Sequence, residues 1–139
     1  NMEADALYER FNAFMADAVT LYDDALPVLS ALQSRFTIGI ASNALASSQR
    51  ARVAAMGIPI EHVFLSEEMG CVKPARAFFE GAARAAGLAP GDCLMVGDSL
   101  TSDIAAAAGA GMIAASFGIA CLLSLRVRSI APRALLTAE

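Results

Sequence analysis

Short apolar runs of strand length alternate with segments of helical periodicity along most of this 139-residue chain. The runs are apolar on both faces, which is typical of strands that helices cover from each side. Strands that alternate with helices favour right-handed crossovers and a mostly parallel sheet. The pattern therefore predicts a Rossmann-like α/β fold, with a mostly parallel sheet flanked by helices. The expected strands are residues 36–41, 63–65, 93–96 and 112–117, and the expected helices are residues 4–23, 25–33, 45–56, 75–86 and 103–108.

Polar residues follow these expected strands, and ligands of open parallel sheets bind beyond the carboxyl ends of the strands. Ser42 and Asn43 come directly after the first strand. A hydroxyl beside the free N–H groups that open a helix can cradle a phosphate, although both residue types are also common helix caps. Pro74 biases Lys73 toward an extended backbone, which would aim its ammonium along the same edge. There Lys73 would neutralise a phosphoryl group, unless it is a solvated surface lysine.

Two aspartates follow the third expected strand. Asp98 comes directly after it, where Gly97 allows a sharp turn. A carboxylate in that position suits Mg²⁺, which takes one or two carboxylates together with phosphate oxygens and water. Asp103 lies about one helical turn further on. We expect it to hold a metal-bound water or to orient Lys73, or otherwise to complement the helix dipole as a first-turn acid.

These residues fall in three stretches that resemble the second, third and fourth signature motifs of the haloacid dehalogenase (HAD) superfamily. Their order and spacing agree with the family over about residues 20–117. The residues of the third and fourth motifs are most similar to those of the phosphatase branch with a helical cap, including the pyrimidine 5′-nucleotidase-like members. Three motifs in order, each preceded by an expected strand, are far more specific than one motif alone. The stretches are Ile38-Gly39-Ile40-Ala41-Ser42-Asn43, the run from Leu65 to Pro74, and the run from Val96 to Ile104 with the trailing Ala110-Gly111-Met112.

The resemblance implies a HAD-like α/β core at residues 25–118, preceded at residues 1–24 by the remnant of a helical cap and its linker. Residues 119–139 form a C-terminal segment of uncertain structure, because their apolar residues mark no clear element boundaries. The implied function is a Mg²⁺-dependent phosphatase acting on a small phosphorylated metabolite. Ser42, Asn43 and Lys73 would bind the phosphate, and Lys73 and Asp103 would be the catalytic residues. Asp98 would be a Mg²⁺ ligand, with Asp103 as a further metal-site carboxylate.

The first motif of the family, an Asp-x-Asp pair on the central strand that supplies the nucleophile, has no counterpart in this sequence. We therefore expect the chain to begin inside the cap, to bind Mg²⁺ weakly or not at all, and to be inactive on phosphate esters. The missing strand would leave a gap between the strands that lead to Ser42 and Asp98. Self-association, a borrowed strand or repacking would close that gap, because unpaired strand edges are costly when buried.

The missing nucleophile keeps a second function open, a non-catalytic HAD-like module that binds a phosphate ligand or a partner. A phospho-accepting receiver domain is disfavoured, because a receiver's lysine follows its acceptor aspartate, whereas Lys73 precedes Asp98. Dehalogenase chemistry is also disfavoured, because the Gly97-Asp98-Ser99 turn is typical of a metal-using phosphatase.

Composition excludes several other classes of protein. The net charge of −4, without a Lys/Arg cluster, gives no electrostatic footprint for nucleic acid. No apolar stretch approaches the roughly 20 residues of a membrane span, and no signal peptide is evident. The cysteines form no CxxC pair, which predicts free thiols in a reducing cytoplasm. His62 is expected to be structural, and Glu67 with Glu68 to form a solvated loop. The three cysteines are Cys71, Cys93 and Cys121.

Overall fold

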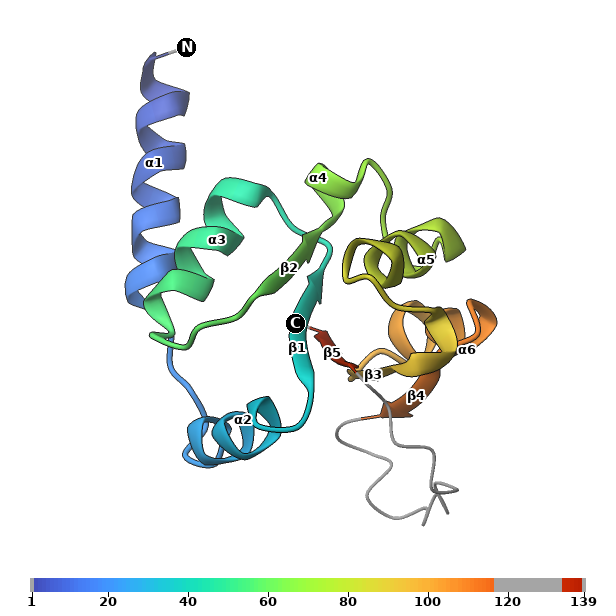
Figure 1. Ribbon diagram of the computed structural model, residues 1–139. Coiled ribbons are helices and arrows are strands. Elements are labelled where there is room, and N and C mark those ends of the chain that lie inside the picture. Colours follow the sequence, from blue (N-terminus) through green and yellow to red (C-terminus); the bar gives the residue numbers. More distant parts are fainter. Residues whose placement is uncertain (1, 117–133, 139) are drawn as a thin grey trace.

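A five-stranded parallel sheet in the order β2-β1-β5-β3-β4 organises the protein. The computed structural model in Figure 1 describes residues 2–116 and 134–138. The parallel sheet flanked by helices confirms the predicted α/β fold class. Each strand predicted from an apolar run is present, and no described end differs from the predicted bound by more than one residue. The strands are β1 Thr37–Ser42, β2 His62–Leu65, β3 Cys93–Gly97, β4 Ile113–Ser116 and β5 Ala134–Ala138.

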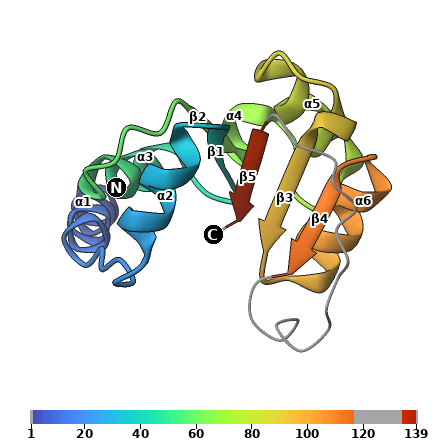
Figure 2. The ribbon, with the colours of Figure 1, turned by 60° about the horizontal axis from the view of Figure 1, so that its bottom comes forward.

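The helices divide into two groups beside the sheet. Helices α1, α2 and α3 gather beside β1 and β2, whereas α5 and α6 lie beside β3 and β4 (Figure 2). The helices are α1 Met2–Asp17, α2 Ala25–Gln33, α3 Ala46–Ala55, α4 Ser66–Met69, α5 Arg76–Ala85 and α6 Ala106–Gly109, with a 3-10 turn η1 Pro90–Asp92 and a π-helical segment η2 Leu100–Ala105.

Three helix predictions need correction. Helix α1 ends at Asp17 rather than at residue 23, since β-branched Val19 and Thr20 disfavour its continuation. Residues 66–69 form the short helix α4 instead of a solvated loop, and Gly70 ends it in the left-handed conformation at φ 66°. The helix expected from residue 103 begins earlier, at Leu100, as a π-helical segment.

Strand β5 occupies the central position that the sequence predicted to be a gap. Its backbone pairs with β1 on one side, where Ala41 is level with Ala138, and with β3 on the other, where Val96 is level with Thr137. The chain thus fills the predicted gap with one of its own strands, and self-association stays a prediction. Residues 134–138, part of the segment of uncertain predicted structure, therefore contribute a strand to the sheet, whereas residues 119–133 lie outside the described residues.

The apolar core lies between the sheet and helices α5 and α6. Helix α5 contributes Phe78 and Phe79, both fully buried, with ring centroids 5.6 Å apart in an edge-to-face arrangement. Burying a phenylalanine side chain stabilises the fold by about 1.5–3 kcal/mol. Phe64 of β2 and Met95 of β3 belong to the same cluster, so the core ties the two sides of the sheet to one helix.

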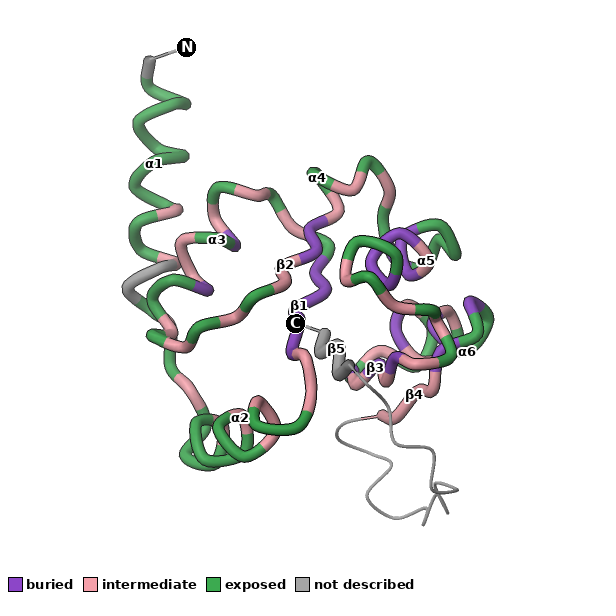
Figure 3. The backbone as a smooth tube through the Cα atoms, in the orientation of Figure 1, coloured by how far each residue is buried: buried purple, intermediate pink, exposed green. Residues whose placement is uncertain are grey.

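Helix α1 lies outside this core. Figure 3 shows it almost entirely exposed, and Leu7, Phe11 and Phe14 are 67%, 55% and 66% exposed. A hydrogen bond of 2.8 Å between the Tyr8 hydroxyl and Ser47 Oγ connects α1 to α3. In the part of the chain that the structure describes, every helix is too short or too polar to cross a bilayer.

Candidate active site

Lys73 lies buried at the carboxyl edge of the sheet, with 6% of its surface exposed. Its ammonium Nζ donates one hydrogen bond to the carbonyl oxygen of Ala41 at 2.9 Å and another to Asp103 Oδ1 at 2.7 Å. The lysine therefore bridges the end of β1 and the segment η2 that follows β3. Lys73 thus lies at the edge where Ser42 ends β1 and Asp98 follows β3, as the sequence predicted, and the alternative of a solvated surface lysine is excluded.

Asp103 is fixed as the counter-ion of this lysine. It is 2% exposed, and its second oxygen, Oδ2, accepts a hydrogen bond of 3.2 Å from the backbone N–H of Ser99. Gly97 makes room for it, because a Cβ at that position would lie 2.6 Å from Asp103 Cβ. Of the roles predicted for Asp103, the geometry matches the one in which it orients Lys73. Its predicted role at a metal site stays a prediction.

The side-chain amide of Asn43 binds the backbone of Lys73 from the other direction. Asn43 Nδ2 donates to the Lys73 carbonyl oxygen at 2.8 Å, and the Lys73 N–H donates to Asn43 Oδ1, also at 2.8 Å. The structure shows the side chain of Asn43 bound to the lysine backbone, and the predicted binding of phosphate by Asn43 stays a prediction. Nothing in the local sequence signals this contact, because the two residues are 30 positions apart.

Ser42 ends β1 and is buried, at 5% exposed. The helix that was expected to open beside it, α3, begins four residues later at Ala46. The N–H of Ala46 already donates to Glu67 Oε2 at 2.6 Å. Any phosphate cradle beside Ser42 would therefore use the N–H groups of the loop before α3 rather than those of the helix start.

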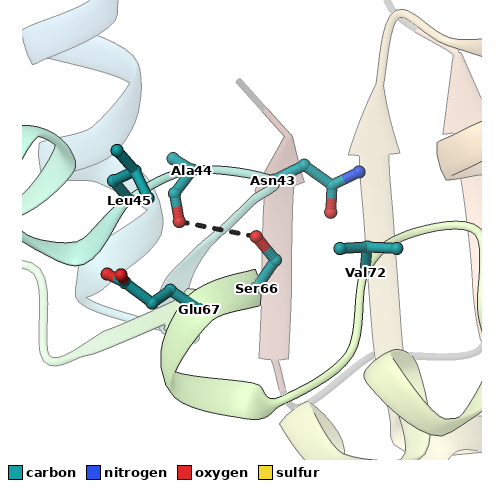
Figure 4. Close-up of a pocket in the computed structure, with 6 residues that line it drawn as sticks. All are labelled: Asn43, Ala44, Leu45, Ser66, Glu67 and Val72. Carbon is teal, nitrogen blue, oxygen red and sulfur yellow. Dashed lines mark hydrogen bonds between the residues drawn. The ribbon is translucent and has the colours of Figure 1, made fainter.

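A pocket of about 380 Å³ opens next to this loop (Figure 4). Ser66 Oγ donates to the carbonyl oxygen of Ala44 at 3.4 Å across it, and Glu67 points toward the loop from α4. Glu67, expected in a solvated loop, thus caps α3. The pocket is lined by Asn43, Ala44, Leu45, Ser66, Glu67 and Val72.

The neighbouring Glu68 pairs with Arg50 of α3, whose Nε and Nη2 each donate to one carboxylate oxygen at 2.7 Å. The hydrogen bonds from this guanidinium lower the pKa of the Glu68 carboxyl and raise that of Arg50. Both side chains are well exposed, so the pair holds α4 against α3 only weakly.

Asp98 directly follows β3 at the same sheet edge and is exposed. Among the described residues, no three His, Cys, Asp or Glu side chains gather into a cluster that could hold a metal ion. Mg²⁺ needs only one or two carboxylates when phosphate oxygens and water complete its shell. Asp98 fits that role, whereas both oxygens of Asp103 already accept a hydrogen bond.

Comparison with known sequences places these residues in a family. The sequence profile of the haloacid dehalogenase-like hydrolases matches residues 3–111. The pyrimidine 5′-nucleotidase YjjG of Escherichia coli is 33% identical over 115 residues, which cover 81% of this chain and 51% of the relative. The glyceraldehyde 3-phosphate phosphatase of Methanopyrus kandleri is 37% identical over 95 residues, which cover 66% of this chain and 41% of the relative. The chain thus spans about half the length of the curated relatives it matches.

Solved structures agree with the sequence relatives. A HAD phosphatase from Thermococcus onnurineus shares the fold with a TM-score of 0.73 at 24% identity, over 94% of this chain and 59% of that one. The putative HAD-hydrolase YfnB of Bacillus subtilis, solved bound to magnesium, gives a TM-score of 0.71 at 26% identity, over 94% of this chain and 57% of that one. The family profile matches most of the length of this chain, and solved members share its fold. This chain therefore belongs to the haloacid dehalogenase-like hydrolase family.

Proposed function

We propose that this chain is the core part of a cytoplasmic, Mg²⁺-dependent phosphatase that acts on a small phosphorylated metabolite. The observation that carries the proposal is the buried ammonium of Lys73 at the sheet edge where ligands of this fold bind. An ammonium has three N–H donors, and two of them are bound to Ala41 and Asp103. The third can donate to an oxygen of a phosphoryl group.

The groups of the site would divide the work as follows. The Ser42 hydroxyl and the N–H groups of the loop after it would bind phosphate oxygens, and the Lys73 ammonium would offset their charge. Asp103 would keep that ammonium in place. Asp98 would hold Mg²⁺, which when bound supplies further neutralisation of a phosphoryl group.

The pocket beside Asn43 would receive the organic part of the substrate. Its volume of about 380 Å³ is within the range of small-molecule sites, roughly 300–1,000 Å³. Leu45 and Val72 supply apolar wall, whereas Glu67 places a carboxylate beside it. This lining favours a small, weakly polar organic group over one that carries a second negative charge.

One observation favours a second candidate function, phosphate binding without hydrolysis. Covalent catalysis of phosphate ester hydrolysis in this family uses a carboxylate nucleophile from the central strand, which would lie in line with phosphorus. Residues 134–138, which form the central strand β5, contain neither aspartate nor glutamate. In this case the chain would hold phosphate at Ser42 and Lys73 and release it unchanged.

Hydrolysis of an aryl phosphate with Mg²⁺ tests both candidates. The chain is assayed as it stands and in a version extended upstream to include an Asp-x-Asp strand, each beside its Lys73→Met variant. We expect turnover in the extended version alone, lost with Lys73→Met. Phosphate binding by the present chain without turnover in either version would select the second candidate. Turnover by the present chain that Lys73→Met abolishes would show that it already contains its nucleophile.

A further inference from the structure

Residues 41–43 bind both the side-chain ammonium and the backbone of Lys73. The carbonyl oxygen of Ala41 accepts from the lysine ammonium at 2.9 Å, whereas the Asn43 amide binds the lysine backbone through two hydrogen bonds of 2.8 Å. Ser42, the predicted phosphate ligand, lies between these two anchors. The position of Lys73 along the sheet edge is therefore fixed relative to the position of Ser42.

Few other contacts fix the backbone of Lys73. The segment between α4 and α5 follows Gly70, Val72 is 55% exposed, and Pro74 is also exposed. Within this segment the Ala75 N–H donates to the carbonyl oxygen of Val72 at 2.8 Å, which closes the turn around Lys73 without linking it to the sheet. The Asn43 amide supplies that link. A side-chain amide offers one acceptor and two donors, and here it satisfies both backbone polar groups of a single residue.

We propose that Asn43 is a positioning residue, which sets the Lys73 ammonium in register with Ser42 so that both reach the same phosphate group. The inference rests on the proposed function, because it takes phosphate as the shared ligand. It differs from the role that the sequence predicted for Asn43. With Oδ1 and one N–H of Nδ2 bound to the backbone of Lys73, the side chain acts on phosphate through the position of the lysine.

Lys73 is the single lysine of the chain, which gives the proposal a readout that does not depend on phosphate. An acylating reagent forms stable amides only at Lys73 and the terminal amine, and mass spectrometry separates these two products. We expect the rate at Lys73, relative to the terminal amine, to rise about tenfold in Asn43→Ala, because two hydrogen bonds that hold the lysine are lost. Gln33→Ala is the matched control, since it removes a side-chain amide hydrogen bond to a backbone carbonyl, that of Pro59, at the end of α2, which precedes the amino end of β1.

Calorimetric titration with inorganic phosphate completes the test through a double-mutant cycle of Asn43→Ala and Lys73→Met. We expect Asn43→Ala to weaken phosphate binding about tenfold when Lys73 is present and to have no further effect in the Lys73→Met background. Circular dichroism first verifies that each variant is folded, because Lys73→Met leaves Asp103 buried without its counter-ion. An equal loss in both backgrounds would make Asn43 a direct phosphate ligand and overturn the proposal.

Three other outcomes separate this inference from the proposed function. An unchanged acylation rate in Asn43→Ala would overturn the positioning role, whether or not phosphate binds. A raised acylation rate, with phosphate affinity unaffected by Lys73→Met, would refute the proposed function and, with it, the shared phosphate, while leaving the lysine held by Asn43. Lower thermal stability in Asn43→Ala, with the acylation rate and the phosphate affinity both unchanged, would mean that Asn43 only stabilises the fold, and would overturn the positioning role.

Discussion

Replacing Asp103 with asparagine removes the negative charge opposite Lys73 and keeps the shape of the side chain. The two side chains are 3% and 5% exposed, and the ammonium and carboxylate lie 2.7 Å apart. At an effective dielectric constant of about 20, that separation corresponds to an attraction of about 6 kcal/mol. Removing both charges from water offsets most of this attraction, so the pair itself contributes little to net stability.

Breaking the pair is a different matter, because it leaves one charge buried without compensation. We expect Asp103→Asn to lower the free energy of unfolding by about 3–5 kcal/mol, and Lys73→Met to lower it by a similar amount. The double variant Lys73→Met/Asp103→Asn buries no charge and should return to within about 1–2 kcal/mol of the parent. A loss of this size is a large part of the 5–15 kcal/mol typical of a domain.

Urea unfolding followed by far-ultraviolet circular dichroism measures these differences. A loss below about 1 kcal/mol for each single change would refute the burial of an uncompensated charge, because the two groups would then be solvated. A double variant that loses the sum of the two single losses would also refute it, because the charges would then be uncoupled.

Two further predictions follow from other ionisable groups. Burial raises the pKa of the Cys93 thiol, so its contribution to stability is present at neutral pH and is lost as the pH rises from the unfolded value near 8.5 toward the folded one. The urea-derived stability should therefore fall more steeply between pH 8 and 10 in the parent than in Cys93→Ala, and equal slopes would contradict this. Glu68→Gln should lower the free energy of unfolding by less than about 1 kcal/mol, because the Arg50–Glu68 pair is exposed, and the difference should shrink in 1 M salt. A larger, salt-independent loss would mean that the pair is shielded from solvent.

The sheet edge could be predicted from the sequence because the signals are local. The runs before Ser42 and Asp98 are apolar on both faces, which identifies covered parallel strands, and parallel strands end at a common edge. Gly97 was interpreted as a residue that allows a sharp turn, whereas in the structure it is the last residue of β3, where the close approach of Asp103 leaves no space for a Cβ. The convergence of Lys73 and Asp103 followed from these features alone.

The remaining features depend on contacts between distant parts of the chain. Asn43 and Lys73 meet because α5 and β1 are brought together by the core, and no spacing rule records that contact. Glu67 and Glu68 are polar residues after a short strand, so their helix was mistaken for a loop, although Gly70 is a helix-ending signal. Residues 134–138 are strand-like only when β1 and β3 flank them.

The central place of β5 has a consequence for how the protein folds. Strands β1 and β2, and likewise β3 and β4, are joined by short crossovers, so each pair can form early from nearby segments. The strand between them comes from beyond β4, and Thr37 must find Ala134 before the sheet is continuous. Pairing over such long sequence separation slows folding, and each half-sheet presents an open edge in the meantime. The rate-limiting step and the risk of aggregation therefore both depend on the insertion of the same strand.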